Sequence, residues 1–169
     1  MVSVDYELRK KVMDAHIHDT LKYCYQCNRC TDNCPISKVA PERYDPRSII
    51  LSSFLGIKPS VLEAEDPFAL WGCTICDTCD EVCPQNIELT EIFAILKNMS
   101  IKRGEGPEYY TQQASTIYEN GKAIPMQSAI ERRRDDLGLP KIEAPDVQEI
   151  QTILNKSKLN VILDKNKEE

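Results

Sequence analysis

Apolar residues recur at spacings of three and four positions along much of this chain, which is the period of an amphipathic helix. Strict alternation of apolar and polar residues, the pattern of a half-buried strand, extends over no useful length. The pattern predicts helices at 5–13, 46–55, 89–103, 108–120 and 128–137, a short helix at 59–64, turns at 19–23 and 67–70, and a last helix opening at Pro145-Asp146. The expected fold class is therefore all-α.

Capping residues mark the boundaries of the two central helices. Asp45 and Pro46 are suited to the N-cap and first position of helix 46–55, and Gly56 is suited to the position just past its end. Helix 89–103 has Thr90 as a candidate cap, and Lys97 is among the basic residues that suit its C-terminal end. We expect helix 46–55 to be largely buried through its apolar residues, which are Ile49, Ile50, Leu51, Phe54 and Leu55. Helix 89–103 has a broad apolar face made of Ile92, Phe93, Ile95, Leu96 and Met99.

The N-terminal segment and the histidines carry less information. Asp5 is a candidate N-cap for helix 5–13, in which Leu8 and Val12 lie one turn apart. His16 and His18 are the only histidines of the chain, and we interpret them as solvated or core-capping side chains rather than ligands.

All eight cysteines fall into two runs with the same spacing, C-x2-C-x2-C-x3-C-P. The first run is Cys24, Cys27, Cys30 and Cys34 before Pro35, and the second is Cys73, Cys76, Cys79 and Cys83 before Pro84. This is the spacing of bacterial ferredoxins, in which the fourth cysteine of each run binds the cluster of the other run. The sequence therefore predicts two [4Fe–4S] clusters with all eight cysteines as metal ligands.

Disulfides and zinc are the alternative uses of eight thiols in a chain of this length. Four disulfides fit a secreted protein, and nothing in the sequence indicates export. Zinc sites favour CxxC pairs separated by longer loops, whereas each run here places three cysteines at i, i+3 and i+6. The spacing favours iron–sulfur clusters over both.

The residues between the cysteines indicate how each cluster is covered and charged. Asn28 tolerates the left-handed backbone that a run wrapping around an anion requires. Ile36 and Val39 are candidate covers for a cluster, and Trp71 is expected to be a core anchor. Acidic residues follow the second run's cysteines, whereas Arg29 lies in the first, so we expect the second run's cluster to have the lower reduction potential; the acids are Asp77, Asp80 and Glu81.

Composition and charge exclude several classes of partner. The 169 residues are 41% hydrophobic and carry a net charge of −6, which argues against nucleic acid, because a basic face is expected there. No apolar stretch approaches the roughly 20 residues that span a bilayer. The first residues lack the charged and apolar regions of a signal peptide. We therefore expect a cytoplasmic protein without a membrane partner.

The last third of the chain differs from the rest. We expect a two-cluster domain with an N-terminal arm at 1–104, and a helical extension and tail at 105–169. Arg132-Arg133-Arg134 is interpreted as a solvated face, with a docking patch as the alternative. The tail after Lys158 is expected to be polar and mobile, apart from Val161-Ile162-Leu163, which hints at docking onto a partner protein.

The chemistry points to electron transfer rather than catalysis by this chain. A [4Fe–4S] cluster with four thiolate ligands has no open iron site, so it carries single electrons and binds no substrate. The sequence contains no Rossmann glycine fingerprint, no nucleophile–histidine motif and no spare cysteine. We expect no catalytic residue.

Four segments resemble the C subunit of the heterodisulfide reductases of methanogenic archaea. They are KYCYQCNRCTDNCP at 22–35, DPRSII at 45–50, LWGCTICDTCDEVCP at 70–84, and the helix running to Lys102-Arg103-Gly104. The resemblance covers roughly residues 5 to 125. The same cysteine scaffold occurs in the helical iron–sulfur domain of succinate dehydrogenase and fumarate reductase, but no plant-type [2Fe–2S] domain is attached here.

The resemblance implies an alpha-helical ferredoxin-like domain that relays electrons from a flavin-bearing A subunit to the B subunit. The B subunit, which carries CCG motifs, reduces the mixed disulfide of coenzyme M and coenzyme B in methanogenesis. Hydrogenase or formate dehydrogenase would be further partners in a larger complex. By the crossed rule, one cluster would be held by Cys24, Cys27, Cys30 and Cys83, and the other by Cys73, Cys76, Cys79 and Cys34.

Two other electron-transfer roles stay open at this point. One is an iron–sulfur subunit of another dehydrogenase, acting on succinate, fumarate or glycerol 3-phosphate. The other is a free ferredoxin, although a diffusible carrier would not need the long insert or the C-terminal third.

Overall fold

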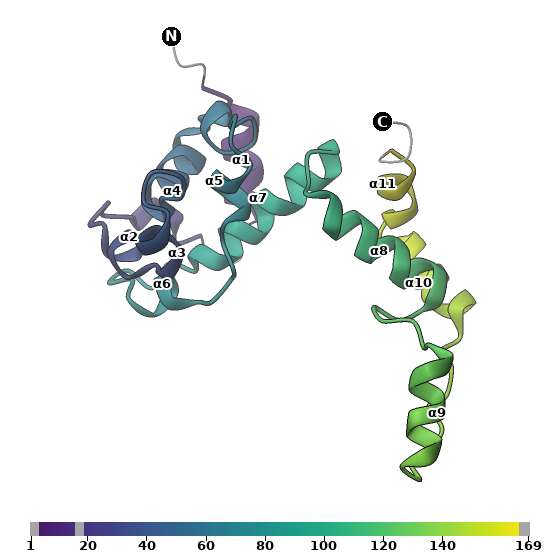
Figure 1. The fold of residues 1–169 in the computed structure, drawn as a ribbon. Helices are drawn as coiled ribbons and strands as arrows, with labels where there is room; N and C mark the ends of the chain where they lie inside the picture. The colour runs from purple at the N-terminus through teal and green to yellow at the C-terminus, as the bar shows by residue number, and fades with distance from the viewer. Residues whose placement is uncertain (1–3, 16–18, 166–169) are drawn as a thin grey trace. The chain divides into compact units, whose positions relative to one another are not determined.

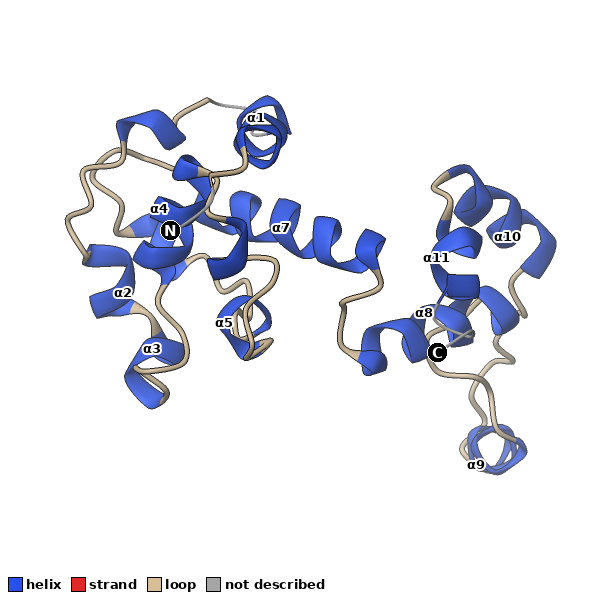
Figure 2. Ribbon diagram, turned by 90° about the horizontal axis from the view of Figure 1, so that it is seen from above, coloured by secondary structure: helices blue, strands red, loops and turns tan. Residues whose placement is uncertain are grey.

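The computed structural model describes residues 4–15 and 19–165, so His16 and His18 lie outside the described residues. Within these ranges the secondary structure is helical and no strand occurs (Figures 1 and 2). The expectation of an all-α fold is confirmed. The chain divides into two compact units, residues 1–103 and 104–169. Whether each unit folds as an independent domain stays a prediction.

The first unit contains the two cysteine runs. Its helices are α1 (Tyr6–Ala15), α2 (Arg29–Asn33), α3 (Pro35–Val39), α4 (Pro46–Leu55), α5 (Phe68–Trp71), α6 (Thr78–Glu81) and α7 (Leu89–Arg103), with 3-10 turns η1 (Leu21–Tyr23) and η2 (Lys58–Ser60). Helices α1, α4 and α7 were predicted within a few residues, whereas the helix expected at 59–64 is reduced to the single turn η2.

Helix α4 begins and ends where its capping residues predict. The Asp45 carboxylate accepts a hydrogen bond from the backbone N–H of Arg47 at 3.1 Å, which caps the first turn. Gly56 follows the helix with φ +72°, and a Cβ on it would lie 2.3 Å from the carbonyl oxygen of Asp5. The backbone N–H of Asp5 donates to the Gly56 carbonyl at 2.7 Å. A glycine is required at this position, because α1 starts against the end of α4.

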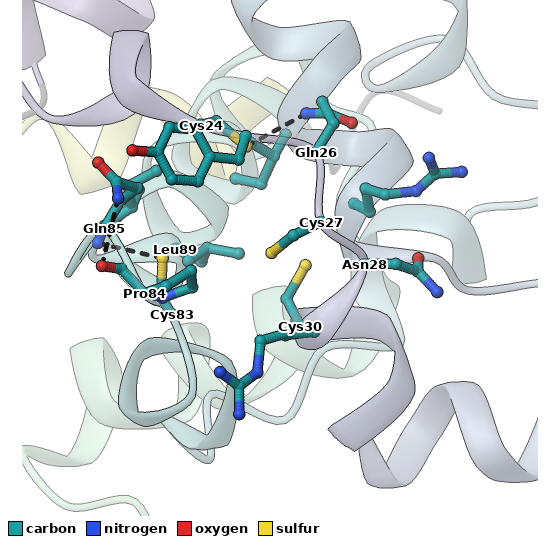
Figure 3. Close-up of a pocket in the computed structure, with 14 residues that line it drawn as sticks. Cys24, Gln26, Cys27, Asn28, Cys30, Cys83, Pro84, Gln85 and Leu89 are labelled. Carbon is teal, nitrogen blue, oxygen red and sulfur yellow. Dashed lines mark hydrogen bonds between the residues drawn. The ribbon is translucent and has the colours of Figure 1, made fainter.

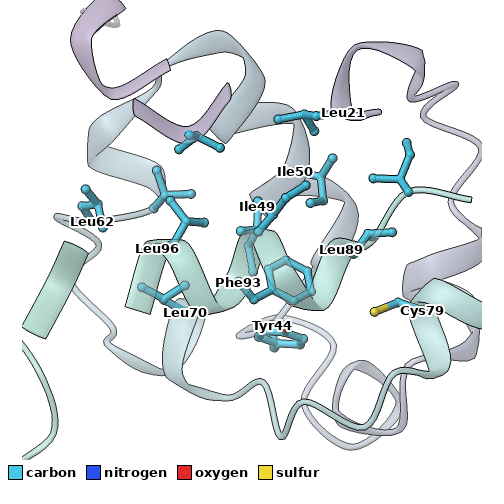
Figure 4. Packing of buried hydrophobic residues seen from close by; sticks show 14 of the residues in the cluster. Leu21, Tyr44, Ile49, Ile50, Leu62, Leu70, Cys79, Leu89, Phe93 and Leu96 are labelled. Carbon is cyan, nitrogen blue, oxygen red and sulfur yellow. The ribbon is translucent and has the colours of Figure 1, made fainter. Parts of the chain in front are cut away.

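The hydrophobic core of the first unit lies between α1, α4 and α7 (Figure 4). Phe93 of α7 is at its centre, with the ring of Tyr44 packed edge-on against it at a centroid distance of 6.5 Å. Two cysteines, Cys34 and Cys79, belong to the same buried cluster. Its other members are Leu8, Val12, Leu21, Ile49, Ile50, Val61, Leu62, Leu70, Ile87, Leu89, Ile92 and Leu96.

The burial of α4 differs from the expectation. Leu51 and Leu55 are 37% and 40% exposed, because they lie one turn apart on the outer side of the helix. Ser52 and Ser53 are buried instead. The Ser53 hydroxyl donates to the Ile49 carbonyl at 2.7 Å, so its burial leaves no unpaired donor.

Two further expectations about single residues were wrong. Val39 is 86% exposed and covers nothing, because it lies at the end of the short helix α3. Thr90 is the second residue of α7 rather than its N-cap, and its hydroxyl donates to the Asp80 carboxylate. Trp71 is half-buried and packs against the core, as expected of an anchor.

The second unit consists of α8 (Glu108–Asn120), α9 (Ser128–Asp136), α10 (Val147–Lys156) and α11 (Leu159–Lys165). Helix α10 packs on α8, with the Tyr118 hydroxyl donating to Asn155 Oδ1 at 3.1 Å. The tail after Lys158, which was expected to be polar and mobile, forms helix α11, which packs on α8 and α10, and its Leu163 is buried. None of the described helices is both long and apolar enough to cross a membrane.

Candidate iron–sulfur site

The two cysteine runs adopt the same backbone conformation. In each run the residue before the second cysteine and the residue after it have positive φ, with values of 57° at Gln26, 69° at Asn28, 51° at Ile75 and 60° at Asp77. A short helix then carries the third cysteine: α2 in the first run and α6 in the second. Alternation of right- and left-handed residues turns successive backbone N–H groups toward one side, which is how a chain forms a concave anion-binding surface.

Sequence reasoning found part of this pattern. The left-handed backbone predicted at Asn28 is confirmed. Asp77, at the equivalent position of the second run, is also a residue type that tolerates positive φ. Gln26 and Ile75 give no such signal, and a β-branched residue with φ +51° is strained.

Helices α2 and α6 pack against each other and bring the two runs together. Their backbone hydrogen bonds correspond one to one. The N–H of Thr31 donates to the Asn28 carbonyl, and that of Asp80 to the Asp77 carbonyl, each at 3.0 Å. At the fourth cysteine, the N–H of Cys34 donates to the Thr31 carbonyl at 3.1 Å, and the N–H of Cys83 to the Asp80 carbonyl at 3.2 Å.

A cavity that is partly open to solvent is lined by three cysteines of the first run and one of the second. Figure 3 shows the side chains of Cys27 and Cys30 on one side of this cavity and that of Cys83 on the other. The four cysteines that line it are Cys24, Cys27, Cys30 and Cys83. These four cysteines are the same four that the crossed rule groups as the ligands of one cluster.

A second cavity is lined by three cysteines of the second run and one of the first. The cysteines that line it are Cys34, Cys73, Cys76 and Cys79, which belong to the other expected set. Ile36, Tyr44 and Phe93 also line it, so the expected cover by Ile36 falls on this cavity. The second cavity therefore borders the hydrophobic core directly.

Hydrogen-bond donors point at several of the cysteine sulfurs. Gln26 Nε2 donates to Cys24 Sγ at 3.2 Å, and the backbone N–H groups of Ile75 and Ile87 donate to Cys73 Sγ and Cys83 Sγ, each at 3.4 Å. Such bonds favour thiolates over thiols and are one of the terms that set cluster potentials.

The first cavity also fits an anionic group. Arg47 lines the first cavity, and its buried Nε atom has no hydrogen-bond partner among the described residues. A buried donor in that state needs an acceptor, which the sulfur atoms of a cluster would provide. No three His, Cys, Asp or Glu side chains of the described residues converge on a point suited to one ion. A [4Fe–4S] cluster instead takes one thiolate on each of its four irons.

Burial changes the protonation of the free thiols. It raises the pKa of Cys30 to about 11, and burial together with the neighbouring Asp80 carboxylate raises the pKa of Cys79 further. Hydrogen bonds from the hydroxyl and backbone of Thr78 lower the pKa of Cys76, which is exposed. A metal that binds these buried thiols must displace their protons.

Each run is tied to a core helix through the residue after its third cysteine. In the first run the Thr31 hydroxyl donates to the Asp45 carboxylate, which caps α4. In the second run the Asp80 carboxylate accepts bonds from the backbone N–H and the hydroxyl of Thr90, in the first turn of α7. Both short helices are thus held against the long helices of the core.

Comparison with known proteins bears on the identity of this site. Residues 20–87, which contain both runs, match the family model of the 4Fe-4S dicluster domain. The C 2 iron–sulfur subunit of the CoB–CoM heterodisulfide reductase of Methanocaldococcus jannaschii is 31% identical over 163 residues, covering 93% of this chain and 84% of the relative. The chain belongs to the family of heterodisulfide reductase C subunits.

Other relatives in this family differ in the electron donor that their names give. The C2 subunit of the H2/formate:CoB–CoM heterodisulfide,ferredoxin reductase of Methanococcus maripaludis is 31% identical, with 85% of this chain and 78% of the relative covered. The C subunit of the ferredoxin:CoB–CoM heterodisulfide reductase of Methanosarcina mazei is 30% identical, with 78% of each chain covered. These similarities support a 4Fe-4S electron-transfer subunit of an oxidoreductase.

Two buried residues that pack against the second cysteine run were missed in the sequence. Tyr44 is fully buried, and its pKa is raised far above the ordinary value by burial and by the adjacent Cys73 side chain. Lys97 was placed with the basic residues at the end of its helix, but it is buried and its Nζ donates to the Cys73 carbonyl at 2.6 Å. No local pattern identifies either residue, because their burial depends on the packing of distant segments.

Proposed function

We propose that this chain is the electron-relay subunit of a heterodisulfide reductase complex. It would pass single electrons through two [4Fe–4S] clusters, from a flavin-bearing A subunit to the B subunit, which reduces the heterodisulfide of coenzyme M and coenzyme B. The observation that carries the proposal is the pair of cavities, each lined by three cysteines of one run and the fourth of the other. Family membership supports the reaction to which the electrons go.

The cysteines would have the same task in both halves of the relay. Cys24, Cys27, Cys30 and Cys83 would hold one cluster, and Cys73, Cys76, Cys79 and Cys34 the other. Each bound cluster supplies one-electron redox chemistry. The thiolates would occupy every iron, so the chain would offer no position at which a disulfide substrate could bind. The sequence has no CCG motif of the kind expected in the B subunit.

The residues around the cysteines would keep the relay rigid. The backbone N–H groups of Ile75 and Ile87, already directed at sulfur atoms, would stabilise the thiolates without rearrangement. Packing of α2 on α6 fixes the two sets of ligands in one body. A rigid frame favours electron transfer, because little of the protein has to move when the charge of a cluster changes.

Anaerobic purification of the native protein, with identification of the chains that co-purify, tests this proposal. We expect a flavoprotein and a protein with CCG motifs, together with about eight iron and eight sulfide per relay subunit. A dehydrogenase for succinate, fumarate or glycerol 3-phosphate among the partners would replace the proposed reaction. A chain that purifies alone would contradict the subunit role, and zinc without sulfide would exclude the clusters.

A further inference from the structure

Lys97 is a buried lysine in the middle of α7. Its side chain is 7% exposed, and its Nζ lies 2.6 Å from the carbonyl oxygen of Cys73 and 5.4 Å from the centre of the Trp71 ring. Lysine is almost never buried to this degree unless its charge is compensated. The carbonyl and the ring supply partial negative charge, but neither is an anion.

The described part of the chain offers Lys97 no carboxylate partner. The ion pairs of the first unit use other cations, such as Arg43 with Asp66 and Lys58 with Glu63. The three acids of the second run do not form an ion pair with Lys97 either. Asp77 and Glu81 are exposed, and Asp80 is occupied by hydrogen bonds from Thr90. A buried cation in this state is unfavourable unless an anion lies nearby.

The second cavity is where such an anion would sit. Cys73 lines it with Cys34, Cys76 and Cys79, and Lys97 binds the backbone of Cys73 itself. A [4Fe–4S] cluster with four thiolates is negatively charged in both of its working states. Reduction adds one electron, and hence one more negative charge, without making or breaking a bond.

We propose that Lys97 is a positioning residue for the second cluster, holding the start of the second run and raising the cluster's reduction potential with its buried positive charge. The inference rests on the proposed function, since it requires a cluster in the second cavity. The effect of Lys97 is opposite in sign to the effect expected from the acids in the sequence. A buried charge is screened far less than the exposed carboxylates of Asp77 and Glu81.

Redox titration of the full-length protein, followed by EPR, tests the role of the charge. Lys97→Gln removes the charge but keeps a hydrogen-bond donor, and Lys97→Arg keeps the charge. Lys102→Gln is the matched control, because Lys102 is an exposed lysine on the same helix. Cys27→Ser and Cys76→Ser assign the two EPR signals. We expect K97Q to shift the potential of the second cluster to a more negative value, while K97R and K102Q leave it near that of the unmodified protein.

The outcomes separate this inference from the proposed function. Absence of iron and sulfide from the unmodified protein would overturn the relay itself. If K97Q keeps both clusters at unchanged potentials, the proposed relay is unaffected and the role proposed for Lys97 is wrong. If iron analysis shows that K97Q loses the second cluster and K97R keeps it, the proposed role of the positive charge is supported. If both variants lose the second cluster, Lys97 contributes only by packing, and the inference is overturned.

Discussion

The two cysteine runs are alike in backbone and opposite in the chemistry that joins them to the core. In the first run a hydroxyl on the run, Thr31, donates to a carboxylate on α4, Asp45. In the second a carboxylate on the run, Asp80, accepts from a hydroxyl on α7, Thr90. Both contacts join a threonine hydroxyl to an aspartate carboxylate, but the donor lies on the run in the first case and on the core helix in the second. The repeat therefore preserves the position of each short helix rather than the residue types that hold it.

The runs differ in the segment after the fourth cysteine and in the surroundings of each cavity. Pro35 opens helix α3, whereas the chain after Pro84 makes a turn in which Asn86 has φ +50°. Both cavities border the buried core, but the first is also lined by the arginines Arg29 and Arg47, whereas no arginine among the described residues lines the second. Equal spacing gives equal ligand geometry, so any difference in potential must come from these surroundings.

The largest expected effect comes from breaking the exchange of ligands between the runs. Cys34→Ala should remove the cluster of the second cavity, because Cys34 lines that cavity with the three first cysteines of the other run. Iron should fall from about eight to about four per chain. Cys76→Ala should lose the same EPR signal, and Cys27→Ala the other. If C34A and C27A lose the same signal, the ligands are not crossed.

A smaller effect is expected from removing the carboxylates that hold the runs to the core. Asp45→Ala and Asp80→Ala should each lower stability by about 1–2 kcal/mol, since each removes a helix-capping acceptor. The rate at which visible cluster absorption is lost in denaturant measures this. Glu42→Ala, at an exposed position between α3 and α4, is the control. An equal rate for E42A and D80A would show that the contacts with α7 contribute nothing.

The contribution of Asp45 to the stability of the protein should also depend on pH. Burial raises the pKa of Asp45, but hydrogen bonds from Ser48 and Thr31 outweigh it and hold the pKa below its ordinary value. The stabilisation is therefore present above about pH 4 and is lost as the pH falls below that. The difference between D45A and the unmodified protein should shrink in acid, and a constant difference would contradict a charged cap.

The sequence predicted the elements whose signals are local. Capping residues predict where α4 and α10 begin, and the helical spacing of apolar residues predicts α7 and α8. The cysteine spacing leads to the same two groups of four that line the cavities. These features depend on neighbours within a few residues, so one sequence is sufficient to find them.

The features that were missed depend on packing between distant segments. Lys97 has the sequence context of a solvated helix position, yet α5 and the start of the second run cover it. Leu51 looks like a core residue but lies on the outer side of α4. Helix α11 lacks a strong periodic signal, and its burial of Leu163 depends on α8 and α10 being in place.

A further, modest effect concerns the strained position of the second run. Ile75 has φ +51° and is 48% exposed, so its side chain gains little from burial. Ile75→Asn should stabilise the protein by about 1 kcal/mol, because Asn adopts left-handed backbone at lower cost than a β-branched residue. Slower loss of cluster absorption in denaturant would measure it. Gln26→Asn is the matched change in the first run and should give a smaller gain, since Gln is not β-branched.

The smallest expected effect concerns the acids that distinguish the second run in the sequence. Asp77 and Glu81 are exposed, so water and salt screen their charges from the cavity. Asp77→Asn and Glu81→Gln should each raise the potential of the second cluster by less than about 20 mV, or about 0.5 kcal/mol for one electron. The shift should vanish at 1 M salt, where the Debye length is about 3 Å. A larger shift that persists in high salt would restore the acids as the main difference between the two runs.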